Sequence, residues 1–114
     1  MVWFTGTHED SDTEVKMKVY KFFRFKFTEA WWQLSSDEQA AHMAKIEEAR
    51  KKVGCKLIIS ATPYWAEEQW MGCGVEELPS VEAAMQYAQL LYDLSSARYF
   101  QGESWLATER PPEV

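Results

Sequence analysis

The stretch AWWQLSSDE, residues 30–38, decides how this chain folds. Ser35 and Glu38 stand three residues apart, which is the spacing of a capping box. In that motif the serine hydroxyl accepts from the glutamate amide, and the glutamate carboxylate accepts from the serine amide. Leu34, directly before the cap, is suited to act as a hydrophobic staple. The stretch therefore predicts that a strand ends near the two tryptophans and that a helix begins at Ser36.

This helix is expected to extend from about residue 36 to residue 53. Gly54 follows as a good C′ residue, because glycine adopts the left-handed conformation that ends a helix. The predicted buried stripe consists of Met43, Ile46, Ala49 or Arg50, and Val53. His42 lies one turn before Ile46 and beside that stripe.

Residues 17–27, on the other side of the opening stretch, alternate as a strand does. One face carries Met17, Val19, Phe23, Phe25 and Phe27, interrupted by Lys21, and the other carries Lys18, Tyr20, Phe22, Arg24 and Lys26. Aromatic residues on both faces predict a strand that is covered on both sides. Arg24 then has two interpretations: it lies in a partly enclosed, electropositive place, or it emerges at the sheet rim and pairs with a glutamate.

The rest of the chain predicts three more strands and one more helix. The strands are expected at residues 55–62, at 69–76 and within 98–108, and the helix runs from an N-cap at Ser80 to residues 95–96. The order βαββαβ predicts an α+β, ferredoxin-like sandwich: a four-stranded antiparallel sheet with two helices on one face.

Two features of this sheet bear on function. On the strand at 69–76, Gly72 and Gly74 share a face with Trp70, which leaves room for a close neighbour, either packed backbone or a ligand. The face away from the helices is apolar, with Tyr20, Phe22 and Trp70 on it or near it, and is expected to be covered by a second copy of the chain.

The domain is expected to span residues 15–109. Residues 1–14 read as a polar N-terminal tail, in which Trp3 and Phe4 anchor onto the domain or onto a second subunit. Residues 110–114 form a C-terminal tail, in which the prolines prevent strand formation.

Composition excludes several classes of protein. The 114 residues predict one domain, and 46% hydrophobic and 15% aromatic residues argue against disorder. A net charge of −6 disfavours nucleic acid and anionic membrane surfaces as partners. No apolar run reaches the ~20 residues of a membrane span, and the N-terminus lacks the pattern of a signal peptide. Cys55 and Cys73 lack a C-x-x-C spacing, so reduced thiols and a cytoplasmic location are expected.

Two short motifs carry a resemblance to a known group. They are Trp31-Trp32-x-Leu34-Ser35-x-x-Glu38 and the run Ser95–Phe100 followed by Gly102. Together with the βαββαβ order they resemble the dimeric α/β-barrel superfamily, and within it the chlorite dismutase and coproheme decarboxylase domain and the darcynin-like proteins. The resemblance spans roughly residues 17–108 and implies that two copies pair their sheets as a dimeric α/β barrel.

The chain departs from the heme-binding members at the iron ligand. Carried over without gaps, their proximal histidine falls on Ile46, the glycine after it on Glu47, and the arginine after the capping acid on Gln39. His42 would substitute only if the helix were shifted, and His8 in the tail is a poorer candidate. A metal site would also need clustered ligands at fixed spacing, and none is evident. We therefore expect no cofactor and no metal, with heme binding as a less favoured alternative.

The expected function is that of a homodimer that binds a small aromatic or apolar anionic molecule in a cavity between sheet and helices. The predicted wall consists of Tyr20, Phe22, Arg24, Trp31, Trp32, Tyr64 and Trp70. Relatives by resemblance include cofactor-independent monooxygenases and polyketide cyclases, which implies that Arg24 binds an anionic oxygen and that His42 or Tyr64 shuttles a proton. The alternative is a non-catalytic dimeric structural or interaction protein whose aromatic residues are dimer core.

Overall fold

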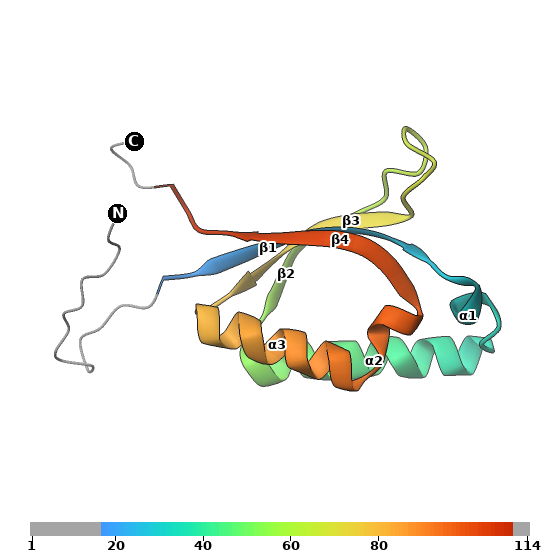
Figure 1. The fold of residues 1–114 in the computed structure, drawn as a ribbon, viewed down its shortest axis with the longest axis horizontal. Helices are drawn as coiled ribbons and strands as arrows, with labels where there is room; N and C mark the ends of the chain where they lie inside the picture. The colour runs from blue at the N-terminus through green and yellow to red at the C-terminus, as the bar shows by residue number, and fades with distance from the viewer. Residues whose placement is uncertain (1–16, 111–114) are drawn as a thin grey trace, which may run out of the picture.

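The chain folds into a four-stranded antiparallel sheet with helices on one of its faces (Figure 1). The structure, a computed structural model, describes residues 17–110. The predicted contacts of Trp3 and Phe4, and His8, lie outside the described residues. The elements are β1 (Val19–Phe27), α1 (Glu29–Trp32), α2 (Ser36–Val53), β2 (Lys56–Ala61), β3 (Gly72–Leu78), α3 (Val81–Asp93), the 3-10 turn η2 (Ser96–Arg98) and β4 (Phe100–Ala107).

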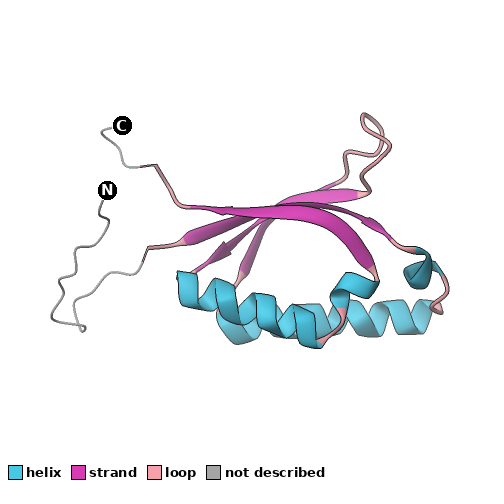
Figure 2. Ribbon diagram, viewed as in Figure 1, coloured by secondary structure: helices cyan, strands magenta, loops and turns pink. Residues whose placement is uncertain are grey.

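The strands lie side by side in the order β2-β3-β1-β4, and all neighbours are antiparallel. Figure 2 shows the helices gathered below the sheet, whereas the loop between β2 and β3 rises on the opposite side. The order and the one-sided helix layer are those of the ferredoxin-like α+β fold, so the predicted fold class is confirmed.

The helix after the opening stretch begins and ends where the sequence predicts. Ser35 Oγ accepts from the Glu38 amide at 3.1 Å, and the Ser35 amide donates to Glu38 Oε1 at 2.8 Å, which completes the capping box. Gly54 ends α2 with a φ of 74°. At the start of α3, Ser80 Oγ accepts from the Ala83 amide at 3.1 Å.

The segment before α2 differs from the prediction. Trp31 and Trp32 do not close the strand but belong to the short helix α1. Thr28 caps this helix through its side chain and also donates from Oγ1 to the Arg98 carbonyl at 2.6 Å. The cap therefore turns the chain at the end of β1 and ties it to the segment before β4.

The strand predicted at 69–76 begins later, at Gly72, because the backbone just before it forms a turn. The Trp70 amide donates to the Glu67 carbonyl at 3.2 Å, so Trp70 does not share a strand face with the glycines. Its ring lies instead under the Arg24 guanidinium, 4.4 Å from centroid to Cζ. α3 also ends earlier than predicted, at Asp93, and η2 follows after Ser95, whose φ is 58°.

Alternation of β1 separates an inner face, which the helices cover, from an outer face. Val19 belongs to the core with the helices and Lys21 lies over the α3 residue Tyr87, so the odd-numbered residues face inward. Tyr20, Phe22, Arg24 and Lys26 therefore lie on the outer face, as predicted.

The best-packed part of the interior, here called the closed end, lies where β1 begins and β3 ends. It consists of Val19, Ala49, Val53, Cys55, Leu78, Ala83, Ala84 and Tyr87. The buried stripe of α2 is His42, Ile46, Ala49 and Val53. The prediction of Met43 in this stripe is wrong: its side chain is 43% exposed, since the i, i+4 row runs from His42 to Ile46 instead.

No helix within residues 17–110 combines the length and apolar character needed to cross a membrane. Both cysteines are free thiols.

Candidate functional site

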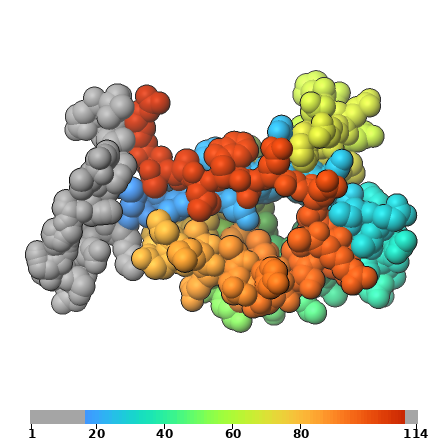
Figure 3. All heavy atoms as spheres, viewed as in Figure 1, coloured from blue at the N-terminus to red at the C-terminus, as the bar shows by residue number. Residues whose placement is uncertain are grey.

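A cavity of about 460 Å³ separates the inner face of the sheet from α2 and α3. Figure 3 shows the molecule hollowed between β4 and the helices below it. The apolar part of its wall includes Phe23, Phe25, Met43, Ile46, Leu91 and Phe100. Such a space is within the range of small-molecule sites, roughly 300–1,000 Å³.

Two aromatic residues of β1, Phe23 and Phe25, lie against glycines of the neighbouring strand β3. A Cβ on Gly72 would come within 2.5 Å of the Phe25 ring, and one on Gly74 within 2.7 Å of the Phe23 ring. The two glycines therefore do make room for a close neighbour: a phenyl ring at Gly72, and the Ile59 backbone carbonyl together with a phenyl ring at Gly74. Phe25 also meets Phe100 of β4 edge to face, with centroids 5.3 Å apart.

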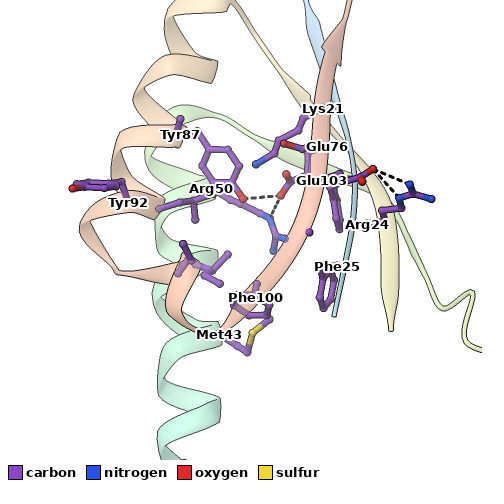
Figure 4. A pocket seen from close by; sticks show the side chains of 18 residues that line it. Lys21, Arg24, Phe25, Met43, Arg50, Glu76, Tyr87, Tyr92, Phe100 and Glu103 are labelled. Carbon is purple, nitrogen blue, oxygen red and sulfur yellow. Dashed lines mark hydrogen bonds and ion pairs between the residues drawn. The ribbon is translucent and has the colours of Figure 1, made fainter. Parts of the chain in front are cut away.

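One end of the cavity is polar and is formed by Lys21, Arg50, Glu76 and Tyr87; we call it the polar end (Figure 4). Glu76 is only 2% exposed, and its Oε2 accepts from Arg50 Nε at 2.7 Å and from the Tyr87 hydroxyl at 2.6 Å. Lys21 is the cross-strand neighbour of Glu76, and its Nζ lies 5.0 Å from the centroid of the Tyr87 ring.

Burial and the Glu76 charge set the protonation of the polar end. Burial, followed by the charge and hydrogen bond of Glu76, raises the pKa of Tyr87, so its phenol stays neutral. Burial opposes the charge of Arg50, but the hydrogen bond and charge of Glu76 outweigh it and raise the pKa of Arg50. Burial, followed by Glu76, raises the pKa of the nearby Cys55 thiol to about 12, so Cys55 is not a thiolate nucleophile.

His42 lies behind the cavity wall and does not line the cavity. Its side chain is 8% exposed, and Nε2 is 3.1 Å from Oγ of Ser96, which does line it. Trp31, Tyr99 and Phe100 surround the imidazole, with ring centroids 4.9–6.3 Å away. Burial, followed by the charge of Lys45, lowers the pKa of His42 and favours its neutral form.

Arg24 borders the cavity, but its guanidinium points away from it, to the outer face (Figure 4). There it pairs with Glu103, with Nη2 2.8 Å from Oε1, and stacks on Trp70. Of the two interpretations of Arg24, pairing with a glutamate at the surface is the one that the structure shows.

The other predicted wall residues do not line this cavity. Tyr20 and Phe22 lie on the outer face, because they are out of phase with the inward residues of β1. Trp31 is buried and stacks on Phe27 at 4.7 Å, while Trp32 and Tyr64 are 56% and 51% exposed. The structure thus brings Arg24 and Phe22 to the outer side of the sheet, with Trp70 against Arg24.

Sequence reasoning missed the four residues of the polar end as a group. A signal was present, since Lys21 interrupts an apolar strand face and Arg50 competes with Ala49 for the buried stripe. Polar residues on a buried face indicate a site only when they lie together, and that depends on how four elements of the fold, β1, α2, β3 and α3, pack.

The residues do not fit a heme of the type that the resemblance implies. Ile46, at the position of the proximal ligand, lines the cavity with an aliphatic side chain that has no donor atom. His42 uses Nε2 toward Ser96 and lies outside the cavity. Within residues 17–110 there is no group of three or more His, Cys, Asp or Glu side chains that could hold a metal ion.

Comparison with known proteins supports the fold alone. Neither protein-family models nor curated proteins match this chain. Two crystal structures of the RPA0582 protein of Rhodopseudomonas palustris, one of them methylated and one described as of unknown function, are similar to it, with TM-scores of 0.61 and 0.62. They are 11% and 12% identical over 90% of this chain and 87% and 89% of theirs. A REP-associated tyrosine transposase bound to a REP hairpin has a TM-score of 0.42 at 8% identity, which carries no argument.

Proposed function

We propose that this protein binds a small aromatic or apolar anionic molecule in the cavity between its sheet and its helices. The observation that carries the proposal is the composition of the cavity wall, in which aromatic and aliphatic side chains surround one polar end. Ligand sites are typically built in this way, because apolar walls supply binding energy and a few polar groups orient the ligand.

The polar end supports binding of a ligand over a purely structural role for the cavity. An interior that serves only stability is close-packed, with few voids larger than a water molecule. Here a space of about 460 Å³, open to solvent where Met43 and Tyr92 are exposed, reaches a buried ion pair, in a small domain whose remaining core is close-packed.

A second copy of the chain is proposed to cover the outer face. The row Ile59, Val75, Phe22 and Trp105 crosses all four strands in register and forms an apolar stripe. Phe22 and Trp105 stack with centroids 5.7 Å apart, and Trp105 and Ile59 are 54% and 55% exposed. The neighbouring charges Arg24 and Glu103 neutralise each other, so the stripe can meet its own copy without like-charge repulsion.

The apolar stripe also favours the alternative, a dimer without a ligand. One experiment on the cavity distinguishes a ligand-binding protein from a dimer without a ligand. Ala88, which lines the cavity from the exposed side of α3, is changed to leucine to fill it, and Ala44, exposed on α2 and away from the cavity, is changed to leucine as the matched control.

The probe is the neutral fluorophore N-phenyl-1-naphthylamine, titrated against each variant. Ala88→Leu should weaken its binding at least about tenfold, a loss of about 1.4 kcal/mol, while Ala44→Leu should leave it unchanged. Absence of binding to the native chain, or binding that both variants retain, would contradict a ligand site in the cavity. Sedimentation of Trp105→Ser against the native chain tests the dimer, which should dissociate in the variant.

A further inference from the structure

The lining of the cavity has three cationic side chains and two carboxylates, although the chain as a whole has a net charge of −6. Three cationic side chains, Lys21, Arg24 and Arg50, line the cavity against two carboxylates, Glu76 and Glu103. Arg24 and Glu103 pair with each other on the outer face, so they cancel. The remaining charged groups of the lining are Lys21, Arg50 and Glu76. Arg50 pairs with Glu76 and also with Glu47, which lies outside the lining, so Lys21 is the cation of the polar end that has no carboxylate partner in the described part of the chain.

Glu76 holds Arg50 in place and leaves part of it free. Among the described residues, the paired nitrogens of Arg50 are Nε, which donates to Glu76, and Nη1, which donates to Glu47 at 3.0 Å. Arg50 lines the cavity, and Figure 4 shows its guanidinium turned toward it, so Nη2 is the nitrogen available to a ligand. An arginine clamped on one side presents its remaining donors at a fixed angle, which suits recognition of a planar anion.

Tyr87 positions the second cation. Its hydroxyl is held by Glu76 at 2.6 Å, and its ring face lies under the Lys21 ammonium at 5.0 Å. A cation over an aromatic ring keeps its charge and its hydrogen-bond donors, because the ring quadrupole attracts it without neutralising it. No carboxylate within residues 17–110 lies within 4.0 Å of Lys21 Nζ.

We propose that Lys21 and Arg50 bind the anionic group of the ligand, a carboxylate or a sulfonate, with Tyr87 and Glu76 as positioning residues. This inference rests on the proposed function and replaces Arg24 as the expected anion-binding residue. The apolar body of the ligand then extends toward Phe25, Met43 and Phe100 on the opposite part of the wall. The Lys21 ammonium supplies the charge, and Arg50 supplies a hydrogen-bond donor beside it. A cation in a partly enclosed space attracts an anion more strongly than an exposed cation does.

The test compares two probes with the same aromatic skeleton, 8-anilinonaphthalene-1-sulfonate and the neutral N-phenyl-1-naphthylamine. Lys21→Met removes the cation and keeps an apolar chain in the wall. Lys26→Met, on the outer face of the same strand and away from the cavity, is the matched control. Lys21→Met should weaken the sulfonate about tenfold and change the neutral probe less than twofold, and Lys26→Met should change neither.

The outcomes separate this inference from the function on which it rests. Equal loss of both probes in Lys21→Met, or no loss of the sulfonate, overturns the anion site, while binding of the neutral probe still supports the cavity. Failure of both probes to bind the native chain overturns the proposed function and the anion site with it. A circular dichroism spectrum of Lys21→Met that matches the native one shows that the fold is intact.

Discussion

The two ends of the space between sheet and helices are built from the same elements but packed in opposite ways. At the closed end, Val19 and Leu78 are 2% and 0% exposed and meet small residues of α3, Ala83 and Ala84. Small side chains let a helix come close to a sheet, so no space remains. At the other end, β1 and β4 present phenyl rings, and the space between the layers stays open as the cavity. Close packing is thus confined to one end of the space between the layers, and this difference predicts that the closed end contributes most of the stability.

The largest expected effect comes from breaking the closed end. Leu78→Ala should lower the free energy of unfolding by about 2–5 kcal/mol, because it removes a fully buried side chain and leaves a void. Met43→Ala, at the cavity wall and 43% exposed, should cost less than about 1 kcal/mol. Urea denaturation measures both, and equal costs would show that the two ends are packed alike.

A second variant tests whether the Glu76 carboxylate fixes the arrangement of the polar end. Glu76→Gln keeps the shape but removes the charge that accepts from Arg50 and Tyr87, and should cost about 2 kcal/mol. Glu103→Gln breaks an ion pair that is about half exposed, so its expected cost is below about 1 kcal/mol. If the two substitutions cost the same in urea denaturation, the polar end is not organised by Glu76.

A smaller effect is expected at the back of the cavity wall. Ser96→Ala removes the partner of the buried His42 Nε2 and should cost about 1 kcal/mol. Ser104→Ala, an exposed residue on the same wall, is the control and should be close to neutral. Thermal unfolding followed by circular dichroism ranks the two, and an inert Ser96→Ala would mean that this hydrogen bond adds nothing to the wall.

The smallest expected effect is on the pH dependence of stability. The folded-state pKa of His42 is lowered below 6.5, so the unfolded chain binds the proton more readily. His42 therefore leaves stability intact above pH 6.5 and lowers it as the pH falls through the folded-state pKa. The Tm of the native chain should fall more between pH 7.5 and pH 5.5 than that of His42→Gln; identical pH profiles would show that the imidazole protonates freely in the fold.

The sequence alone determined most of the fold, because the signals for its elements are local. The capping box at Ser35 and Glu38 and the left-handed Gly54 predicted the bounds of α2 correctly. Alternation along β1 assigned its side chains to the correct faces, since the period of a strand follows from its backbone alone. The order of the elements then predicted the ferredoxin-like class.

Only the tertiary structure decided where a site can be. Alternation separates two faces of β1 but does not tell which one borders a cavity, and the predicted wall residues Tyr20 and Phe22 lie on the other face. The polar end joins Lys21 of β1, Arg50 of α2, Glu76 of β3 and Tyr87 of α3. No spacing along the chain encodes such a meeting, because it depends on how closely the helix layer approaches the sheet, and packing of distant side chains sets that approach.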